Sequence, residues 1–232
     1  MKENEEIIYP ILMSIFVVML VLTNIIGTKI FTLFESVLPN GLFGSPIALT
    51  AGIITYPITF LVTDVTSEIY GKKKASLLVL CGFFCSLLAL IIITIVLKLP
   101  ASNIWLSGSP YNDIKDIELA FSTVFTLPGV LIFASMTAYL TAQLIDIRIF
   151  HFIKKLTNSK YLWLRNNLST MFSQLIDTII VNSIFLGYGM GLEVQIIIQI
   201  IIANYIVKLC FAAIDTPLVY IFVNFIKKYN DN

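Results

Sequence analysis

The sequence has few charged residues, one histidine and no paired cysteine motif, and each shortage excludes a class of protein. Charged residues make up 12% of the 232 positions, and the net charge is +1. Nucleic-acid binding needs a concentrated basic patch, so no nucleic-acid partner is expected. The three cysteines stand in apolar runs without a CxxC or Cys/His cluster. Neither a disulfide framework nor a metal or other cofactor is therefore indicated.

Motifs of common enzymes are missing as well. The chain contains no GxxxxGK[ST], so it is not expected to hydrolyse ATP itself. It also has no GxSxG or HExxH, and its lone His151 stands beside lysines rather than beside a nucleophile. An enzyme is disfavoured, and no catalytic residues are assigned.

Apolar residues, by contrast, are abundant. They form 58% of the chain, the mean hydropathy is +0.92, and several runs reach the roughly 20 residues that cross a bilayer as one helix. The sequence predicts an all-α, polytopic integral membrane protein in which residues 1–232 form a single domain of six transmembrane helices. The expected spans are about 8–31, 47–70, 75–98, 118–147, 166–188 and 194–226. We expect the first run to be a retained span, because no small-residue cleavage site follows it.

The basic residues outside these spans are unevenly divided. One set of alternate segments, which includes both termini, holds 11 Lys and Arg residues, whereas the opposite set holds three. The positive-inside rule then places both termini in the cytoplasm. We expect residues 99–118 to form an outside loop, and residues 151–167 to form a short amphipathic element along the cytoplasmic headgroups.

Polar side chains recur at helical spacing inside several spans. Ser135, Tyr139, Gln143 and Asp146 share one face of the fourth span, and Asn167, Thr170, Gln174 and Asp177 share one face of the fifth. Charges at such depth usually face the bundle interior and mark a substrate or ion path. Two such stripes on neighbouring helices predict a common polar cavity. The other polar positions are Asn24 and Thr28 in the first span, Tyr56, Thr63 and Asp64 in the second, and Asn204, Lys208 and Asp215 in the last.

Simpler roles compete for the charged members of this set. Glu68 and Asp146 lie near basic residues at the predicted helix ends, which favours interfacial acids paired with loop cations. Lys208 has Asp215 or Asp177 as an obvious partner for a structural ion pair. Asp64, Asp177 and Asp215 still outnumber this single deep base, which favours a ligand that carries hydrogen-bond donors or positive charge.

Four segments of the chain contain most of these polar residues, and they read TYPITFLVTDVTSEIYG, SMTAYLTAQLIDIRIF, NNLSTMFSQLIDT and NYIVKLCFAAIDTPLVY. In order and spacing they resemble the signature segments of the queuosine-precursor transporter family, which is also called vitamin-uptake-transporter-like. The resemblance spans roughly residues 20–225. It implies a multi-pass carrier of the cell (inner) membrane that imports a 7-deazaguanine, namely queuine, preQ1 or preQ0, for queuosine salvage in tRNA. The positions that it implicates are Asn24, Thr63, Asp64, Gln143, Asp146, Asn167, Ser169, Thr170, Gln174, Asp177, Lys208 and Asp215.

The residue chemistry suits such a nucleobase. A guanine-like edge offers two adjacent donors to one carboxylate, such as that of Asp177, and its carbonyl needs a donor such as Gln174 or Lys208. A flat ring would also stack on an aromatic side chain, for which Tyr56, Phe60 and Tyr139 are the candidates. The sequence leaves open the preferred base, the coupling ion and whether the chain works as a homo-oligomer. A substrate-binding subunit of a vitamin importer with separate energising proteins is the nearest alternative, and a purely structural membrane protein is a further one.

Overall fold

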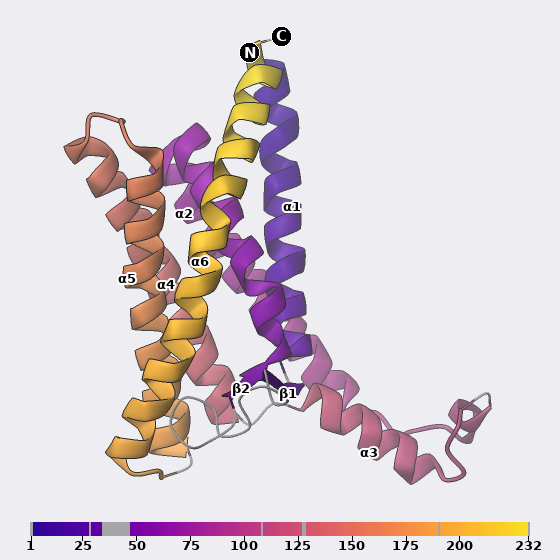
Figure 1. The fold of residues 1–232 in the computed structure, drawn as a ribbon. Coiled ribbons are helices and arrows are strands. Elements are labelled where there is room, and N and C mark those ends of the chain that lie inside the picture. The colour runs from indigo at the N-terminus through magenta and orange to yellow at the C-terminus, as the bar shows by residue number, and fades with distance from the viewer. Residues whose placement is uncertain are drawn as a thin grey trace.

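The molecule is a bundle of long helices that carries a small β-ribbon at one end (Figure 1). The computed structural model describes residues 2–27, 29–33, 47–107, 109–126, 129–189 and 191–231. Within these ranges the α-helices are α1 (Lys2–Ile26), α2 (Tyr56–Val96), α3 (Ile114–Phe125), α4 (Gly129–Leu156), α5 (Leu162–Asn182) and α6 (Val194–Asp231). Strands β1 (Ile30–Leu33) and β2 (Ile47–Thr50) pair antiparallel. Short 3-10 turns cover Ala51–Ile54 and Asn103–Leu106, and a π-helical segment covers Ser183–Gly189.

Four helical segments of the described chain are long and apolar enough to cross a membrane. They are Ile7–Ile26, Ala51–Val96, Leu162–Gly189 and Val194–Tyr229. The second of them has 46 residues, which at 1.5 Å per residue is about twice the thickness of a bilayer. A single straight crossing would leave half of this segment in water, so the path of α2 decides the topology.

The first half of α2 runs antiparallel to α1. Near the ribbon, the hydroxyls of Thr23 and Thr55 lie 2.7 Å apart. Near the other end of α1, the rings of Tyr9 and Tyr70 meet edge to face at 5.4 Å. From the ribbon towards the other end of the bundle, residue numbers therefore rise along α2 and fall along α1. Pro57 stands in the first turn of α2, where its missing N–H costs nothing and its fixed φ suits a helix start.

The chain reverses at Gly71. This residue has φ 81° and ψ 175°, a conformation that only glycine adopts readily. Beyond it, the Tyr9 hydroxyl donates to the Lys74 carbonyl at 3.0 Å, and Gly82 lies against the ring of Phe16. Residue numbers now rise together, so the second half of α2 is parallel to α1. The two halves form a helical hairpin that turns at Gly71.

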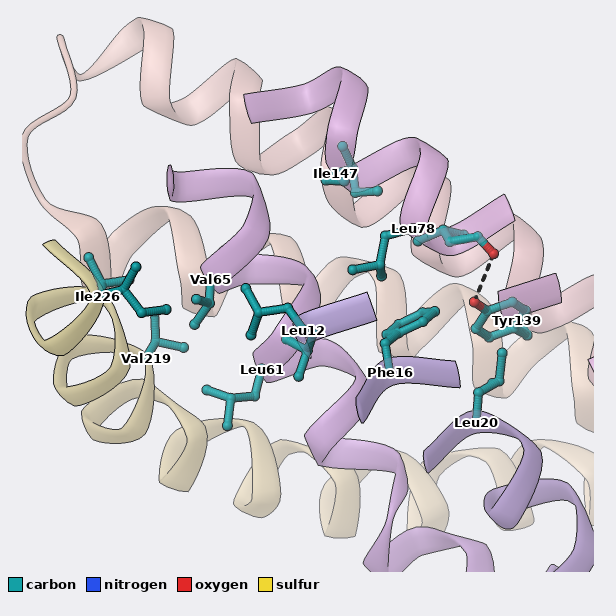
Figure 2. Packing of buried hydrophobic residues seen from close by; sticks show 14 residues of the cluster. Leu12, Phe16, Leu20, Leu61, Val65, Leu78, Tyr139, Ile147, Val219 and Ile226 are labelled. Atoms are coloured by element: carbon teal, nitrogen blue, oxygen red, sulfur yellow. Dashed lines mark hydrogen bonds between the residues drawn. The ribbon is translucent and has the colours of Figure 1, made fainter. Parts of the chain in front are cut away.

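The apolar core lies where both halves of α2 meet α1, α4 and α6. Phe16, Leu78 and Ile147 are fully buried in it, and Figure 2 shows Phe16 beside Tyr139. Gly82 allows this packing, because a Cβ there would lie 2.5 Å from the Phe16 ring. The hydroxyl of Tyr139 donates to the Val79 carbonyl at 3.2 Å, so its polar tip is satisfied within the core.

Four predicted elements differ from those in the structure. The span expected over 118–147 is split, because α3 ends at Phe125 and α4 begins at Gly129. The N-cap of α3 is Asp113, whose carboxylate accepts the Lys115 amide hydrogen, so part of the expected outside loop is helical. The amphipathic element expected over 151–167 does not form, since α4 continues to Leu156 and α5 begins at Leu162. Residues 47–55, expected to be helical, form β2 and a 3-10 turn.

Both chain ends lie at one end of the bundle, and the β-ribbon and α3 lie at the other (Figure 1). The Gly71 reversal is at the end that holds the termini, because Tyr9 near the start of α1 contacts Tyr70 and Lys74. The α4–α5 connection is nearby, since Lys154 and Arg165 on either side of it both pair with Glu68. Lys72–Lys74, Lys154 and Lys160 therefore gather at that end, as the uneven division of basic residues in the sequence predicts.

Candidate functional site

An ion pair joins α5 to α6 in the interior of the bundle. The Lys208 Nζ lies 2.6 Å from Asp177 Oδ2, and the two side chains are 19% and 8% exposed. Asp177 lies on the same face of α5 as Thr170 and Gln174, at the spacing that the sequence predicted. The structural pairing of Lys208 with Asp177 that the sequence analysis considered is therefore present.

Aromatic residues from the start of α2 cover this ion pair. The Lys208 Nζ lies 5.2 Å from the centre of the Tyr56 ring, within the range of a cation–π contact. Tyr56 also lies beside Asp177 and meets the Phe60 ring edge to face at 5.1 Å. A cation, a carboxylate and a flat aromatic surface thus face one another across three helices.

A small cavity opens beside these groups. Its walls are Ile53, Tyr56, Pro57, Thr170, Gln174, Lys208, Phe211 and Ala212. The free space is far below the roughly 300–1,000 Å³ of typical small-molecule pockets, so the walls must separate before a nucleobase fits. Gln174 is 5% exposed, and its Oε1 has no hydrogen-bond donor among the described residues. Buried polar atoms normally have a partner, so this amide is available to a ligand.

A second polar cluster lies between α2, α4 and α5. Asp64 and Asp146 are 1% and 0% exposed. Thr170 Oγ1 donates to Asp64 Oδ2 at 3.5 Å, and Ser173 Oγ donates to Asp146 Oδ1 at 2.9 Å. Thr170 also lines the cavity, so it connects the two clusters.

The remaining predicted residues divide between the site and its surroundings. Gln143 is fully buried one turn before Asp146, and the Thr63 hydroxyl is used within its own helix by the Thr59 carbonyl. Asn167 accepts a hydrogen bond at 3.0 Å from Thr216 and thereby links α5 to α6. These residues lie near the two clusters but outside the cavity wall.

Two predicted residues lie elsewhere, and the side chains of two others are not described. Tyr139 is part of the apolar core (Figure 2). Asn24 lines a different, largely apolar cavity between α1, the second half of α2 and α3. Thr28 and the side chain of Asp215 lie outside the described residues.

The two acids expected at the interface behave differently. Glu68 is paired with cations, since its Oε2 lies 2.7 Å from Arg165 and 2.8 Å from Lys154. The same interpretation is wrong for Asp146, which hydrogen-bonds to Ser173 in the interior. Arg148, two residues later, lies on another face of α4 and is exposed.

Ser173 is a site residue that the sequence analysis missed. Ser169, Ser173 and Asp177 follow at intervals of four residues, so they share a second polar face of α5 next to the predicted one. Extending the stripe by one position around the helix would have found this serine.

Long apolar helices around buried charges are typical of a multi-pass membrane protein with a substrate or ion path. Residues 50–222 match the family described as "Putative vitamin uptake transporter". A "Probable queuosine precursor transporter" of Bacillus subtilis (strain 168) is 31% identical over 182 residues, which are 77% of this chain and 72% of the relative. The chain therefore belongs to this transporter family, and the resemblance seen in the sequence is confirmed.

Two further relatives are similar over a shorter stretch. A "Probable queuosine precursor transporter" of Haemophilus influenzae is 27% identical over 58% of this chain and 51% of its own length. The "Queuosine precursor transporter" of Escherichia coli (strain K12) is 26% identical over 56% of this chain. The chain spans about half the length of these two relatives. No solved structure matches the chain.

Proposed function

We propose that the chain imports a 7-deazaguanine queuosine precursor, namely queuine, preQ1 or preQ0, and binds it between Asp177, Lys208 and Tyr56. The names of three relatives support the substrate class. The observation that carries the proposal is the 2.6 Å ion pair of Asp177 and Lys208, whose lysine lines a cavity.

The ion pair matches the edge of a guanine-like base. The ring N–H and the exocyclic amine are adjacent donors, and the Asp177 carboxylate can accept both. The neighbouring ring carbonyl then faces Lys208, which lies beside that carboxylate. The base would replace the direct contact between the two side chains, so neither charge would lose its partner.

The aromatic wall accounts for the flat ring. Tyr56 is at the cavity, whereas Tyr139 is held in the core by its bond to Val79. Among the three aromatic candidates, Tyr56 is therefore the stacking partner, and Phe60 supports its ring from the side. Gln174 offers one more hydrogen-bonding group at the same wall.

The proposed topology has six crossings. Both halves of α2 cross separately, and α4 adds the crossing between α3 and α5. The end that carries the termini and the basic residues faces the cytoplasm under the positive-inside rule. The cavity, near the start of α2, then lies closer to the outer surface.

Uptake into proteoliposomes that contain only the purified chain tests this function. Labelled queuine, preQ1 and preQ0 are offered separately, and 7-deazaguanine and 7-deazahypoxanthine serve as competitors. Because 7-deazahypoxanthine lacks the exocyclic amine, it should compete at least about tenfold less well, the cost of one hydrogen bond to a charged group.

Three results would contradict the proposal. If the folded chain takes up none of the three bases, the substrate assignment is wrong. Uptake that requires co-purified ATPases would instead support the substrate-binding subunit of a larger importer. Equal competition by the two deazapurines would show that Asp177 does not recognise the base through its exocyclic amine.

A further inference from the structure

Two carboxylates that the proposed base does not contact meet inside the bundle. Asp64 on α2 and Asp146 on α4 are both almost completely buried, and the two side chains lie within hydrogen-bonding reach of each other. Two ionised carboxylates at this separation repel strongly away from water, so the doubly charged pair binds one proton readily. The arrangement therefore calls for a proton between them.

Hydroxyl groups on α5 hold the two acids in place. Thr170 donates to Asp64 and Ser173 donates to Asp146, and these two donors are one turn apart on the same helix. Such neutral donors stabilise one negative charge on the pair without cancelling it.

One oxygen of the pair has no donor among the described residues. Asp146 Oδ2 is buried and accepts no hydrogen bond there, whereas Oδ1 accepts from Ser173. Gln143, fully buried one turn earlier on the same face of α4, has neither amide atom satisfied in the described part of the chain. Buried polar atoms without hydrogen-bond partners around two acids indicate that a very small ligand, which needs no cavity, binds there.

The surrounding charges are already engaged. The ionisable groups near the pair include Tyr56, which interacts with Asp146, Asp177 and Tyr139, and Glu68, which is one turn after Asp64 on α2. Lys208 forms an ion pair with Asp177, and Glu68 forms ion pairs with Arg165 and Lys154. Among the described ion pairs, none neutralises Asp146.

We infer that Asp64 and Asp146 share one exchangeable proton and that this proton is the coupling ion of transport, an inference that rests on the proposed carrier function. One O–H bond forms when the pair takes up a proton from the outside. The same bond breaks when the proton leaves to the cytoplasm. The pair thus alternates between one and two negative charges, and each change alters the hydrogen bonding of α5.

Thr170 connects the proton to the base. Its hydroxyl donates to Asp64, and the same residue lines the cavity next to Gln174 and Lys208. Ionisation of the pair draws the α5 hydroxyls towards the carboxylates, whereas protonation releases them. The position of α5, which also carries Asp177, therefore depends on the proton, so base and proton affect each other's binding reciprocally.

The test uses the full chain in proteoliposomes with the membrane potential clamped at zero by potassium and valinomycin. The probe is labelled queuine, preQ1 or preQ0, whichever the wild-type chain exchanges fastest. An outside pH one unit below the inside should drive about tenfold accumulation if one proton accompanies each base. In Asp146→Asn, which mimics the singly protonated pair with one negative charge, accumulation should fall to about onefold while base-for-base exchange continues at a measurable rate. Asp64→Asn should behave alike, and Asp116→Asn on exposed α3 should respond as the wild type does.

The outcomes separate this inference from the proposed function. Wild-type exchange without any response to the pH gradient would overturn the coupling proton and leave the carrier function standing, whereas no exchange of any base would contradict the carrier function. Accumulation driven by a sodium gradient would also overturn the inference, as would pH-driven accumulation that survives in Asp146→Asn. Infrared spectroscopy of the wild-type protein provides a readout that needs no variant. A protonated-carboxyl band should be present at neutral pH, and its absence would contradict the shared proton.

Discussion

Glu68 and Asp177 are both buried carboxylates that pair with cations between helices, yet their surroundings differ. Glu68 meets Arg165 and Lys154 at 2.7 and 2.8 Å, and Lys227 lies 3.9 Å away. Asp177 has one cation, Lys208, in the described ion pairs, and that cation forms part of a cavity wall.

The difference indicates two roles for the same chemistry. Three cations from α4, α5 and α6 surround Glu68, and the Lys154 ammonium also binds the Glu68 carbonyl, so the contact ties four helices at the end that carries the termini. Asp177 has a single partner that a ligand with donors can replace. We therefore expect Glu68 to act on stability and Asp177 to act on transport.

The largest expected effect is the loss of transport in Asp177→Asn. An amide cannot accept both donors of the guanine-like edge, so about two hydrogen bonds to a charged group are lost. This corresponds to about 3 kcal/mol, or a fall of roughly 100-fold in the initial rate of uptake at low base concentration. The measurement is uptake of labelled base per folded molecule in proteoliposomes.

The exchanged pair Asp177→Lys with Lys208→Asp is the control for this prediction. It keeps an ion pair between α5 and α6 but moves the carboxylate away from the donors of the base. Folded protein without uptake would support recognition of the base, whereas full uptake would show that the pair is only structural.

Glu68→Gln should have the next largest effect, on stability. The substitution leaves Arg165, whose side chain is 2% exposed, without a counter-charge, and breaking a buried pair in this way costs about 3 kcal/mol. A lower melting temperature of the purified protein in detergent would show the loss, with Asp116→Asn as the surface control. An unchanged melting temperature would contradict the proposed tie between the helices.

Gly71→Ala should destabilise the hairpin of α2 by about 1–3 kcal/mol. A Cβ at this position meets nothing within 4 Å, so the whole cost comes from the positive φ of 81°. Gly187→Ala is the matched control, because its Cβ would make an ordinary contact with Ile197 at 3.4 Å. Equal melting temperatures for the two variants would show that the reversal at residue 71 does not require glycine.

Tyr139→Phe should have the smallest effect. It removes the hydrogen bond to the Val79 carbonyl, which is worth about 1 kcal/mol of stability, and it leaves the ring packed against Phe16. Uptake should stay within about twofold of the wild type if Tyr56, rather than Tyr139, stacks on the base. A large loss of uptake in the folded variant would place Tyr139 at the substrate.

The polar stripes were predictable because helical spacing places Thr170, Gln174 and Asp177 on one face whatever the helix packs against. The hairpin in α2 was predictable too, since its apolar run is twice as long as one crossing needs. The start of α4 was not, because the amphipathic helix α3 merges with the following apolar run in a hydropathy count.

Asp146 and Glu68 show where reading a sequence fails. Both acids lie close in sequence to basic residues, and both were interpreted as interfacial. The structure directs Asp146 towards Ser173 and Asp64, whereas Glu68 faces Arg165 and Lys154. The partner of each acid depends on the direction in which its side chain leaves the helix. The distance in sequence to the nearest basic residue does not give that direction.

The sequence by itself determined that the chain is helical, crosses a membrane and carries buried charge, because in hydrocarbon the backbone must satisfy its own hydrogen bonds and a long apolar run leaves only the helix. Only the tertiary structure decided which of those charges meet. The axial offset and rotation of packed helices bring Asp177 to Lys208 and Asp64 to Asp146. Side-chain packing between the helices sets this offset and rotation.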